Sequence, residues 1–421
     1  NLFQLTYNAA DSVIVGKYVG EQALAAVGTS TPIMNIAILL ISGMCMGASV
    51  LMSSQYGAKD YDTLSRQIST TMLAGCGFSV VFSLLMLLLA NPVLRLIRVP
   101  ETAIPEAAAY LRIIFMGLIF TFMYNFLANT MRALGDSKTP LYFLVTSAFL
   151  NIFGDLFFVV VLRWGVAGSA IATVCSEGLC CLLCGIYIKK KIPLLCLGKK
   201  WWVFDKSLLG KTVSYGSTSA MQQVCLQLGK LIIQSVVNTQ GVAVMAAFTA
   251  VNRVDDFAYT PQQNIGHAMT TFLAQNKGAG HKERMKKGFQ TGLLIELVYS
   301  IGLFCVIWGL APQIMTLFAE DGDAQVVSLG ISYLHLISWM YILPGLTNGV
   351  QGFFRGIGDL KVTLYSTFMN MFGRVVAVFV MIRLLQMEFA SLAWANMVGW
   401  IVMLLFEVPL LVKSMRNGEC G

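Results

Sequence analysis

Apolar segments of about twenty residues recur along the whole chain, and this pattern most constrains how it can fold. A helix of that length spans roughly 30 Å of hydrocarbon, because each residue adds about 1.5 Å. With 57% hydrophobic and only 12% charged residues, little sequence remains for a separate water-soluble domain. We therefore predict an all-α integral membrane protein that crosses the bilayer many times.

Charged residues, glycines and prolines between the apolar segments divide the chain into about twelve predicted transmembrane helices. The predicted spans are residues 1–17, 28–55, 68–91, 106–131, 140–162, 166–188, 208–237, 242–274, 287–311, 326–353, 362–384 and 390–413. The chain begins at Asn1 inside an apolar segment, so we expect the first helix to lack its start.

Lysine and arginine are concentrated in every second connection, above all in the run KKKIPLLCLGKKWWVFDK at 189–206. The intervening connections hold only Lys17, Arg95, Arg98, Arg163 and Arg383. Because short basic loops remain on the cytoplasmic side, both ends of the chain are predicted to be cytoplasmic. Basic residues in the predicted cytoplasmic loops thus account for the net charge of +8, and no nucleic-acid partner is expected.

Two turns far apart in the chain share a sequence. RALGDSKTPLY (132–142) and RGIGDLKVTLY (355–365) are 223 residues apart and agree at six of eleven positions. Each is interpreted as a helix-capping turn broken by Gly135 or Gly358. Because the offset covers six helices, the sequence predicts two six-helix lobes related by a parallel repeat. We place the lobes at 1–188 and 208–421, with a cytoplasmic linker at 189–207.

Four polar side chains interrupt predicted spans in the first half of the chain. Asn151 and Asp155 are four residues apart and share a face of the fifth helix, Asp11 lies in the first helix, and Thr173 in the sixth. An ionised side chain at the bilayer centre costs about 2.5 to 3.5 kcal/mol, so these residues need a role. Oxygen ligands of this kind suit Na⁺, and two close carboxylates could instead share a proton. A purely structural role for Asp155, as a hydrogen-bonding tie between helices, is the alternative.

The layout and motifs resemble the multidrug and toxic compound extrusion (MATE) family, in particular its bacterial DinF-like branch. The motifs that carry the resemblance are NAADSVIVGKYVGEQALAAVG (8–28), RALGDSKTP (132–140), LNIFGDLFFV (150–159), GVAGSAIATVCS (165–176) and FFRGIGDLK (353–361). In this family the amino-lobe cation site uses an aspartate in helix one, an Asn-x-x-x-Asp pair in helix five and a threonine in helix six. The resemblance therefore implies that Asp11, Asn151, Asp155 and Thr173 bind the coupling ion, and act as metal ligands if it is Na⁺.

Further charged residues are candidates for accessory roles. Glu177 follows Thr173 by four residues and could join the same helix face, or simply face an aqueous cavity. In the second half, Asp255 and Asp256 lie in the same span as Arg253, with Lys230 and Arg374 in neighbouring spans. Opposite charges so placed are more often mutual partners than ligands, so we place coupling in the amino lobe.

Taken as a MATE transporter, the chain is expected to export amphipathic, often cationic, small molecules in exchange for Na⁺ or H⁺ by alternating access. The resemblance also implies a bacterial inner membrane and a functional monomer. No cofactor and no enzymatic activity are expected, because the sequence holds no histidine cluster, serine–lysine pair or nucleotide-binding loop. The alternative is a flippase for lipid-linked saccharides from the same superfamily.

Overall fold

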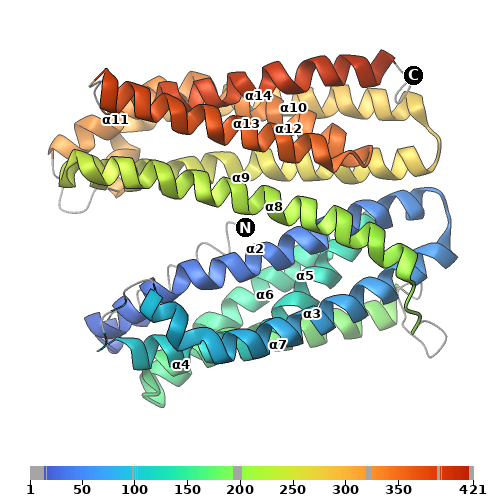
Figure 1. Cartoon of the computed structure of the whole chain (residues 1–421), viewed down its shortest axis with the longest axis horizontal. Coiled ribbons are helices and arrows are strands. Elements are labelled where there is room, and N and C mark those ends of the chain that lie inside the picture. Colours follow the sequence, from blue (N-terminus) through green and yellow to red (C-terminus); the bar gives the residue numbers. More distant parts are fainter. Residues whose placement is uncertain are drawn as a thin grey trace. The chain divides into compact units, whose positions relative to one another are not determined.

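The regular structure of the described residues is entirely helical. The computed structural model describes residues 14–15, 17–96, 99, 101, 103–192, 202–318, 324–385, 389 and 391–416, and all regular structure in these ranges is helical (Figure 1). The predicted all-α class is confirmed. The first predicted helix, residues 1–17, lies almost entirely outside the described residues, of which 14–15 and 17–18 are helical.

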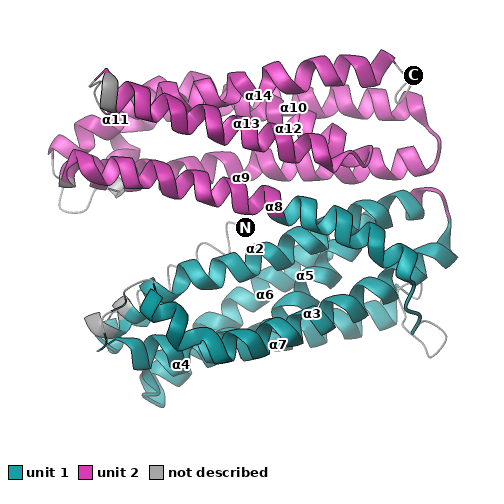
Figure 2. Cartoon of the chain, viewed as in Figure 1, with its two compact units in different colours: residues 1–56, 60–220 teal, residues 57–59, 221–421 magenta. Residues whose placement is uncertain are grey.

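The chain forms two compact units, one made of residues 1–56 and 60–220 and the other of residues 57–59 and 221–421 (Figure 2). The division falls at Ala220, inside α8 (Lys206–Val237), which is a single helix. The lobe boundaries proposed from the sequence, at 188 and 208, therefore remain predictions.

Unit 1 consists of long antiparallel helices around an apolar core formed mainly by α2, α3, α4 and α5. Its helices are α2 (Glu21–Gly57), α3 (Tyr61–Leu96), α4 (Ile104–Met116), α5 (Leu118–Ala133), α6 (Lys138–Asp155), the π-helix η1 (Leu156–Val161), α7 (Gly165–Lys191) and the first part of α8.

Unit 2 holds two buried apolar clusters, one around Tyr333 and Tyr341 and one around Phe353 and Phe354. Its helices are the rest of α8, η4 (Asn238–Gln240), α9 (Val242–Gly278), α10 (Lys282–Phe318), α11 (Ala324–Ser338), η6 (Trp339–Tyr341), α12 (Ile342–Gly356), α13 (Leu360–Val378), the π-helix η7 (Phe379–Leu384) and α14 (Ser391–Arg416).

Among the described residues, 8 helices are long and apolar enough to cross a membrane, or 9 if the bent pair α4–α5 is one span. Helices α8 and α9, with 32 and 37 residues, are also long enough to cross a membrane, but they are more polar than these spans. Together with the largely undescribed first helix, these elements agree with the predicted plan of twelve helices.

Two predicted spans are broken where packing or backbone chemistry requires it. Helices α4 and α5 meet at Gly117 with a bend of 45°. A Cβ atom on Gly117 would lie 2.4 Å from Val174, so α7 approaches too closely for any larger residue. The span 326–353 is interrupted by the 3₁₀ turn η6, just before Pro344, which has no N–H to donate to a preceding carbonyl.

The internal repeat is visible in the backbone itself. Six of the eight described residues with positive φ form pairs: Gly20 (118°) with Gly241 (103°), Lys59 (58°) with Gly280 (72°), and Gly135 (96°) with Gly358 (85°). Members of a pair are 221 or 223 residues apart, as are the starts of η1 and η7. Asp136 N–H donates to the Met131 carbonyl, and Asp359 N–H donates likewise to that of Phe354. Both turns thus cap the preceding helix, as predicted.

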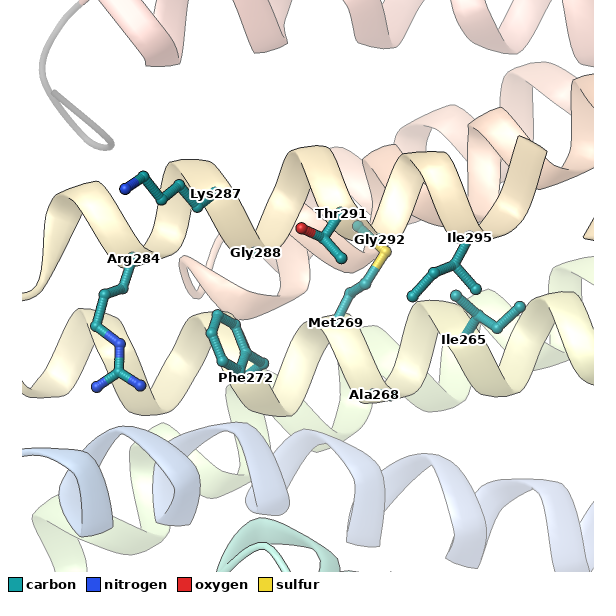
Figure 3. A pocket seen from close by; sticks show the side chains of 10 residues that line it. All are labelled: Ile265, Ala268, Met269, Phe272, Arg284, Lys287, Gly288, Thr291, Gly292 and Ile295. Atoms are coloured by element: carbon teal, nitrogen blue, oxygen red, sulfur yellow. The ribbon is translucent and has the colours of Figure 1, made fainter. Parts of the chain in front are cut away.

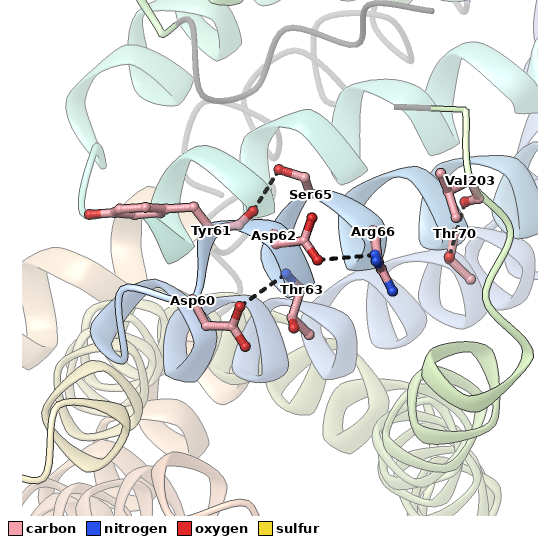
Figure 4. A network of polar contacts seen from close by, with 8 residues as sticks. All are labelled: Asp60, Tyr61, Asp62, Thr63, Ser65, Arg66, Thr70 and Val203. Atoms are coloured by element: carbon pink, nitrogen blue, oxygen red, sulfur yellow. Dashed lines mark hydrogen bonds and ion pairs between the residues drawn. The ribbon is translucent and has the colours of Figure 1, made fainter. Parts of the chain in front are cut away.

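The start of α3 shows how short-range polar contacts fix a helix end (Figure 4). The Asp60 carboxylate accepts a hydrogen bond from the Thr63 N–H at 3.1 Å, which caps the helix. Hydrogen bonds from Thr63 hold the pKa of Asp60 below its usual range. Further along α3, Thr70 Oγ1 donates to the Val203 carbonyl at 3.3 Å and ties the chain that precedes α8 to this helix.

Candidate coupling-ion site

The predicted site centres on the contact between α6 and α7, which pack against each other in unit 1. Asn151 Nδ2 on α6 donates a hydrogen bond of 3.1 Å to Thr173 Oγ1 on α7. A Cβ atom on Gly154 would lie 3.0 Å from that of Ala172, so a glycine lets the two helices approach here. The structure therefore brings together two of the predicted site residues from different helices.

Asp155 lies one turn after Asn151 on the same face of α6, and both side chains are buried, at 0% and 1% exposure. Asp155 is the last residue of α6, and the wider π-helix η1 begins with the next residue. Such π segments inside helices are frequent at functional sites, because they change which side chains face inward. Asn151 Oδ1 has no hydrogen-bond partner among the described residues, so an oxygen ligand is available beside Asp155.

Glu177, one turn after Thr173 on α7, accepts a hydrogen bond from Thr121 Oγ1 on α5. This contact extends the line of polar side chains on α7 towards α5. Thr121 itself carries no signal in the sequence that would have identified it. The fourth predicted ligand, Asp11, lies outside the described residues.

The charged residues predicted to be accessory in the second half lie in unit 2. Lys230 Nζ and Asp256 Oδ1 form an exposed ion pair at 3.4 Å, in line with the interpretation of these charges as mutual partners. Asp255 is buried and accepts a hydrogen bond from the Tyr341 hydroxyl. Neither aspartate is thereby shown to take part in coupling, and an accessory role stays a prediction.

Unit 2 also has a pocket of about 550 Å³ between α9 and α10 (Figure 3). Most of the side chains that line it are apolar, and they include Ile265, Met269, Phe272 and Ile295. One end carries Arg284 and Lys287. Because two cations would repel a positively charged compound, we do not assign this pocket to a cationic substrate.

The chain is similar to known proteins over most of its length. The MatE family model matches residues 1–157 and 219–380. The probable multidrug resistance protein YpnP of Bacillus subtilis is 31% identical over 367 residues, covering 86% of this chain and 81% of that protein. The probable multidrug resistance protein NorM of Thermotoga maritima is 23% identical and covers 96% of this chain and 87% of its own length.

Solved structures share the fold. An outward-facing multidrug resistance MATE family transporter superposes with a TM-score of 0.90 at 22% identity, covering 99% of this chain and 93% of that one. A MATE structure in the straight conformation gives a TM-score of 0.91 with the same coverage and identity. The chain belongs to the MatE family of multidrug and toxic compound extrusion transporters.

Proposed function

We propose that this chain is a multidrug efflux transporter that exchanges Na⁺ or H⁺ for amphipathic, often cationic, organic compounds. The names of its relatives, such as the multidrug resistance proteins above, support the export of drugs. The alternative of lipid-linked saccharide transport has no comparable support in the described structure. Its expected location is a bacterial inner membrane, with both termini in the cytoplasm and a monomer as the functional unit.

The observation that carries the coupling proposal is the α6–α7 contact. Asn151 and Thr173 meet across two helices, and the fully buried Asp155 lies one turn away. Carboxylate, amide and hydroxyl oxygens are ligands that a small hard cation prefers. A buried carboxylate also binds a proton readily, because burial disfavours its charged form.

Binding of a cation or proton would neutralise Asp155 inside unit 1. Loss of that charge lowers the free energy needed to bury Asp155 between α6 and α7. The helices can therefore favour one arrangement when the ion or proton is bound and another when it is absent. Antiport follows if ion and substrate favour opposite states, because the coupling of the two binding free energies is reciprocal. In this scheme Asp155 holds the ion, while Asn151 and Thr173 position it.

The test is dye efflux from proteoliposomes under separately imposed Na⁺ and H⁺ gradients. Asp155→Asn removes the charge at nearly constant size and is expected to abolish ion-driven efflux. Asp62→Asn is the matched control, because Asp62 is exposed and forms an ion pair with Arg66 at 3.2 Å on the surface of α3. Normal efflux by folded Asp155→Asn would show that coupling lies elsewhere. The gradient that drives the wild type identifies the ion.

A further inference from the structure

The pocket between α9 and α10 is not enclosed within unit 2. Two of the apolar side chains that line it, Phe272 and Ile295, are 39% and 49% exposed. Beside Ile295, α10 carries an exposed apolar face formed by Leu294, Val298 and Ile301. Because α10 is long and apolar enough to cross a membrane, such a face borders on lipid chains. The pocket therefore opens towards the hydrocarbon of the bilayer.

Two glycines of α10 shape the pocket. Gly288 and Gly292 are four residues apart and both line it. A Cβ atom on Gly288 would collide with Phe272 of α9, and one on Gly292 would collide with Met269. The glycines are thus already used to pack α9 against α10, and another helix cannot use them for close packing. A space of about 550 Å³ remains next to these contacts.

One end of the pocket is basic and the other is apolar. Figure 3 shows Arg284 and Lys287 together at one end and Ile265 and Ile295 at the other. Both basic side chains are exposed, and neither forms an ion pair within the described part of the chain. Lys287 is the first residue of the predicted span, so this end lies where hydrocarbon meets the polar headgroups. A negative group at that level would compensate both charges.

The length of the pocket corresponds to one leaflet of a bilayer. Arg284 and Ile295 are 11 residues apart on α10, which is about 17 Å along the helix axis. Half of a hydrocarbon core of roughly 30 Å is about 15 Å, so the apolar end lies near the bilayer centre. Thr291, one turn beyond Lys287, brings a hydroxyl donor to the depth at which a lipid carries its ester groups.

We propose that this pocket binds one anionic phospholipid molecule. Its phosphate lies at Arg284 and Lys287, and one acyl chain lies along Met269, Phe272 and Ile295. A guanidinium group can bind two phosphate oxygens at once, and buried chain carbons replace contacts with water or detergent. A zwitterionic lipid is disfavoured, because its own cation is repelled by the two basic side chains. The site does not depend on the proposed transport function.

Other occupants fit these features less well. A soluble anion would compensate the basic end but leave the apolar part of the pocket empty. A second copy that used the same face would bring two further cations to the basic end, because the same surface patch meets itself in a two-fold contact. Only a molecule with a negative head and an apolar chain matches both ends.

The first test is photolabelling of the purified full chain in detergent. A trace of phosphatidylglycerol carries a diazirine near the end of one acyl chain, and peptide mass spectrometry locates the adduct. We expect an adduct on the peptide that holds Thr291 and Ile295. Unlabelled phosphatidylglycerol should displace it about 30-fold more effectively than phosphatidylcholine with the same chains, since each basic residue contributes about fivefold. No adduct there, or equal displacement by the two lipids, overturns the proposal.

A pair of charge variants separates the pocket from general attraction to a basic surface. Arg284→Gln/Lys287→Gln should lose the preference for phosphatidylglycerol over phosphatidylcholine. Lys282→Gln/Lys286→Gln removes the same charge from exposed residues of the same helix that lie outside the pocket, and should keep the preference. Equal losses in the two variants would mean that the basic surface as a whole attracts the lipid, which contradicts the proposed site.

A second pair of variants fills the space without a change of charge. Ala268 is exposed on α9 and lines the pocket, so Ala268→Phe should abolish the adduct on α10. Ala246→Phe is the matched control, because Ala246 is an exposed alanine of the same helix outside the pocket. An adduct that persists in Ala268→Phe rules out a chain in the pocket.

Two further results would identify a different occupant and so refute the lipid. Displacement of the adduct by inorganic phosphate at constant ionic strength would indicate a site for soluble anions. A dimer in detergent that dissociates in Ala268→Phe, but not in Ala246→Phe, would indicate a second copy of the chain.

Discussion

The hydroxyl group of Thr173 accepts the hydrogen bond from Asn151 that links α6 and α7 at the candidate coupling site. Thr173→Val keeps the shape of the side chain but removes the oxygen and leaves Asn151 Nδ2 without this acceptor. Losing a group that orients a metal ligand typically costs 10–100-fold in affinity. We therefore expect the ion concentration for half-maximal efflux to rise about tenfold or more, while Thr173→Ser stays close to the wild type.

A control for this prediction is available on α6. Thr146 is exposed, and its hydroxyl donates to the Tyr142 carbonyl in the same helix at 2.9 Å. Thr146→Val should leave the ion dependence of efflux unchanged. Equal effects of the two valine variants would indicate general damage to the helices and would refute a specific role for Thr173.

The sequence alone could predict that Asn151 and Asp155 lie together, because helix geometry relates spacing in the sequence to position on the helix. A spacing of four residues places Asn151 and Asp155 on one face of a helix, and both are buried as expected. The contact of Asn151 with Thr173 depends on how two helices pack, and only the family resemblance suggested it. Thr121 was missed because hydroxyl groups are common in spans.

The turn between α2 and α3 holds a backbone conformation whose strain can be tested. Lys59 has a φ of 58°, a conformation that costs a residue with a Cβ roughly 1–2 kcal/mol. Its counterpart in the repeat is Gly280, with a φ of 72°. We expect Lys59→Gly to raise stability by about 0.5–1 kcal/mol after the added entropy of the unfolded chain, measured by thermal unfolding in detergent.

The repeat supplies the reciprocal experiment. Gly280→Lys introduces a side chain at the same backbone conformation and should destabilise the protein by about 1 kcal/mol. A third variant, Lys361→Gly in helix α13, should also destabilise it by about 1 kcal/mol, because glycine is unfavourable within a helix. If Lys59→Gly and Lys361→Gly change stability in the same direction, strain at Lys59 is not the cause.

The cap of α3 gives this end of the helix a pH dependence. The pKa of Asp60 is lower in the folded state, because Thr63 donates hydrogen bonds to its charged form. The unfolded chain therefore takes up the proton first as pH falls. The stabilisation is present above the unfolded pKa of about 3.9 and is lost as pH drops through the folded value.

Asp60→Asn should therefore lower Tm at pH 7. The difference in Tm from the wild type should shrink below pH 4, where the Asp60 carboxylate of the wild type becomes protonated. Asp359→Asn is the control, because Asp359 precedes α13 without a side-chain cap hydrogen bond. A difference between wild type and Asp60→Asn that stays constant with pH would contradict the role of the charge.

The ends of some helices were predictable, whereas α2, α3 and α10 extend five to seven residues beyond their predicted spans at one or both ends, and the interruptions were not predictable. Apolar runs and basic turns place α7, α8 and α9 within a few residues of the predicted spans. The bend lies at Gly117, where a Cβ atom would meet Val174, and that long-range contact is absent from any local pattern. The π-helices η1 and η7 likewise occupy apolar sequence that would also suit an ordinary α-helix.

The internal repeat and the distribution of charge together predict on which side of the membrane each turn lies. Ser137 lies in the turn before α6, and Lys361, 224 residues later, lies in the first turn of α13. A parallel repeat places both on one side of the membrane, and the basic residues of these turns indicate the cytoplasm. Thr239 lies in η4, in a connection predicted to be on the opposite side.

Ser137→Cys, Lys361→Cys and Thr239→Cys place a thiol at three positions that are exposed in the structure. In intact cells a membrane-impermeant maleimide should modify only Thr239→Cys, above the background of the native cysteines. After permeabilisation all three should react. Labelling of Ser137→Cys and Lys361→Cys from opposite sides would exclude a parallel repeat. Labelling of both from outside would invert the orientation but keep the repeat, because charge sets the direction of insertion and the offset of six helices sets the relation between the halves.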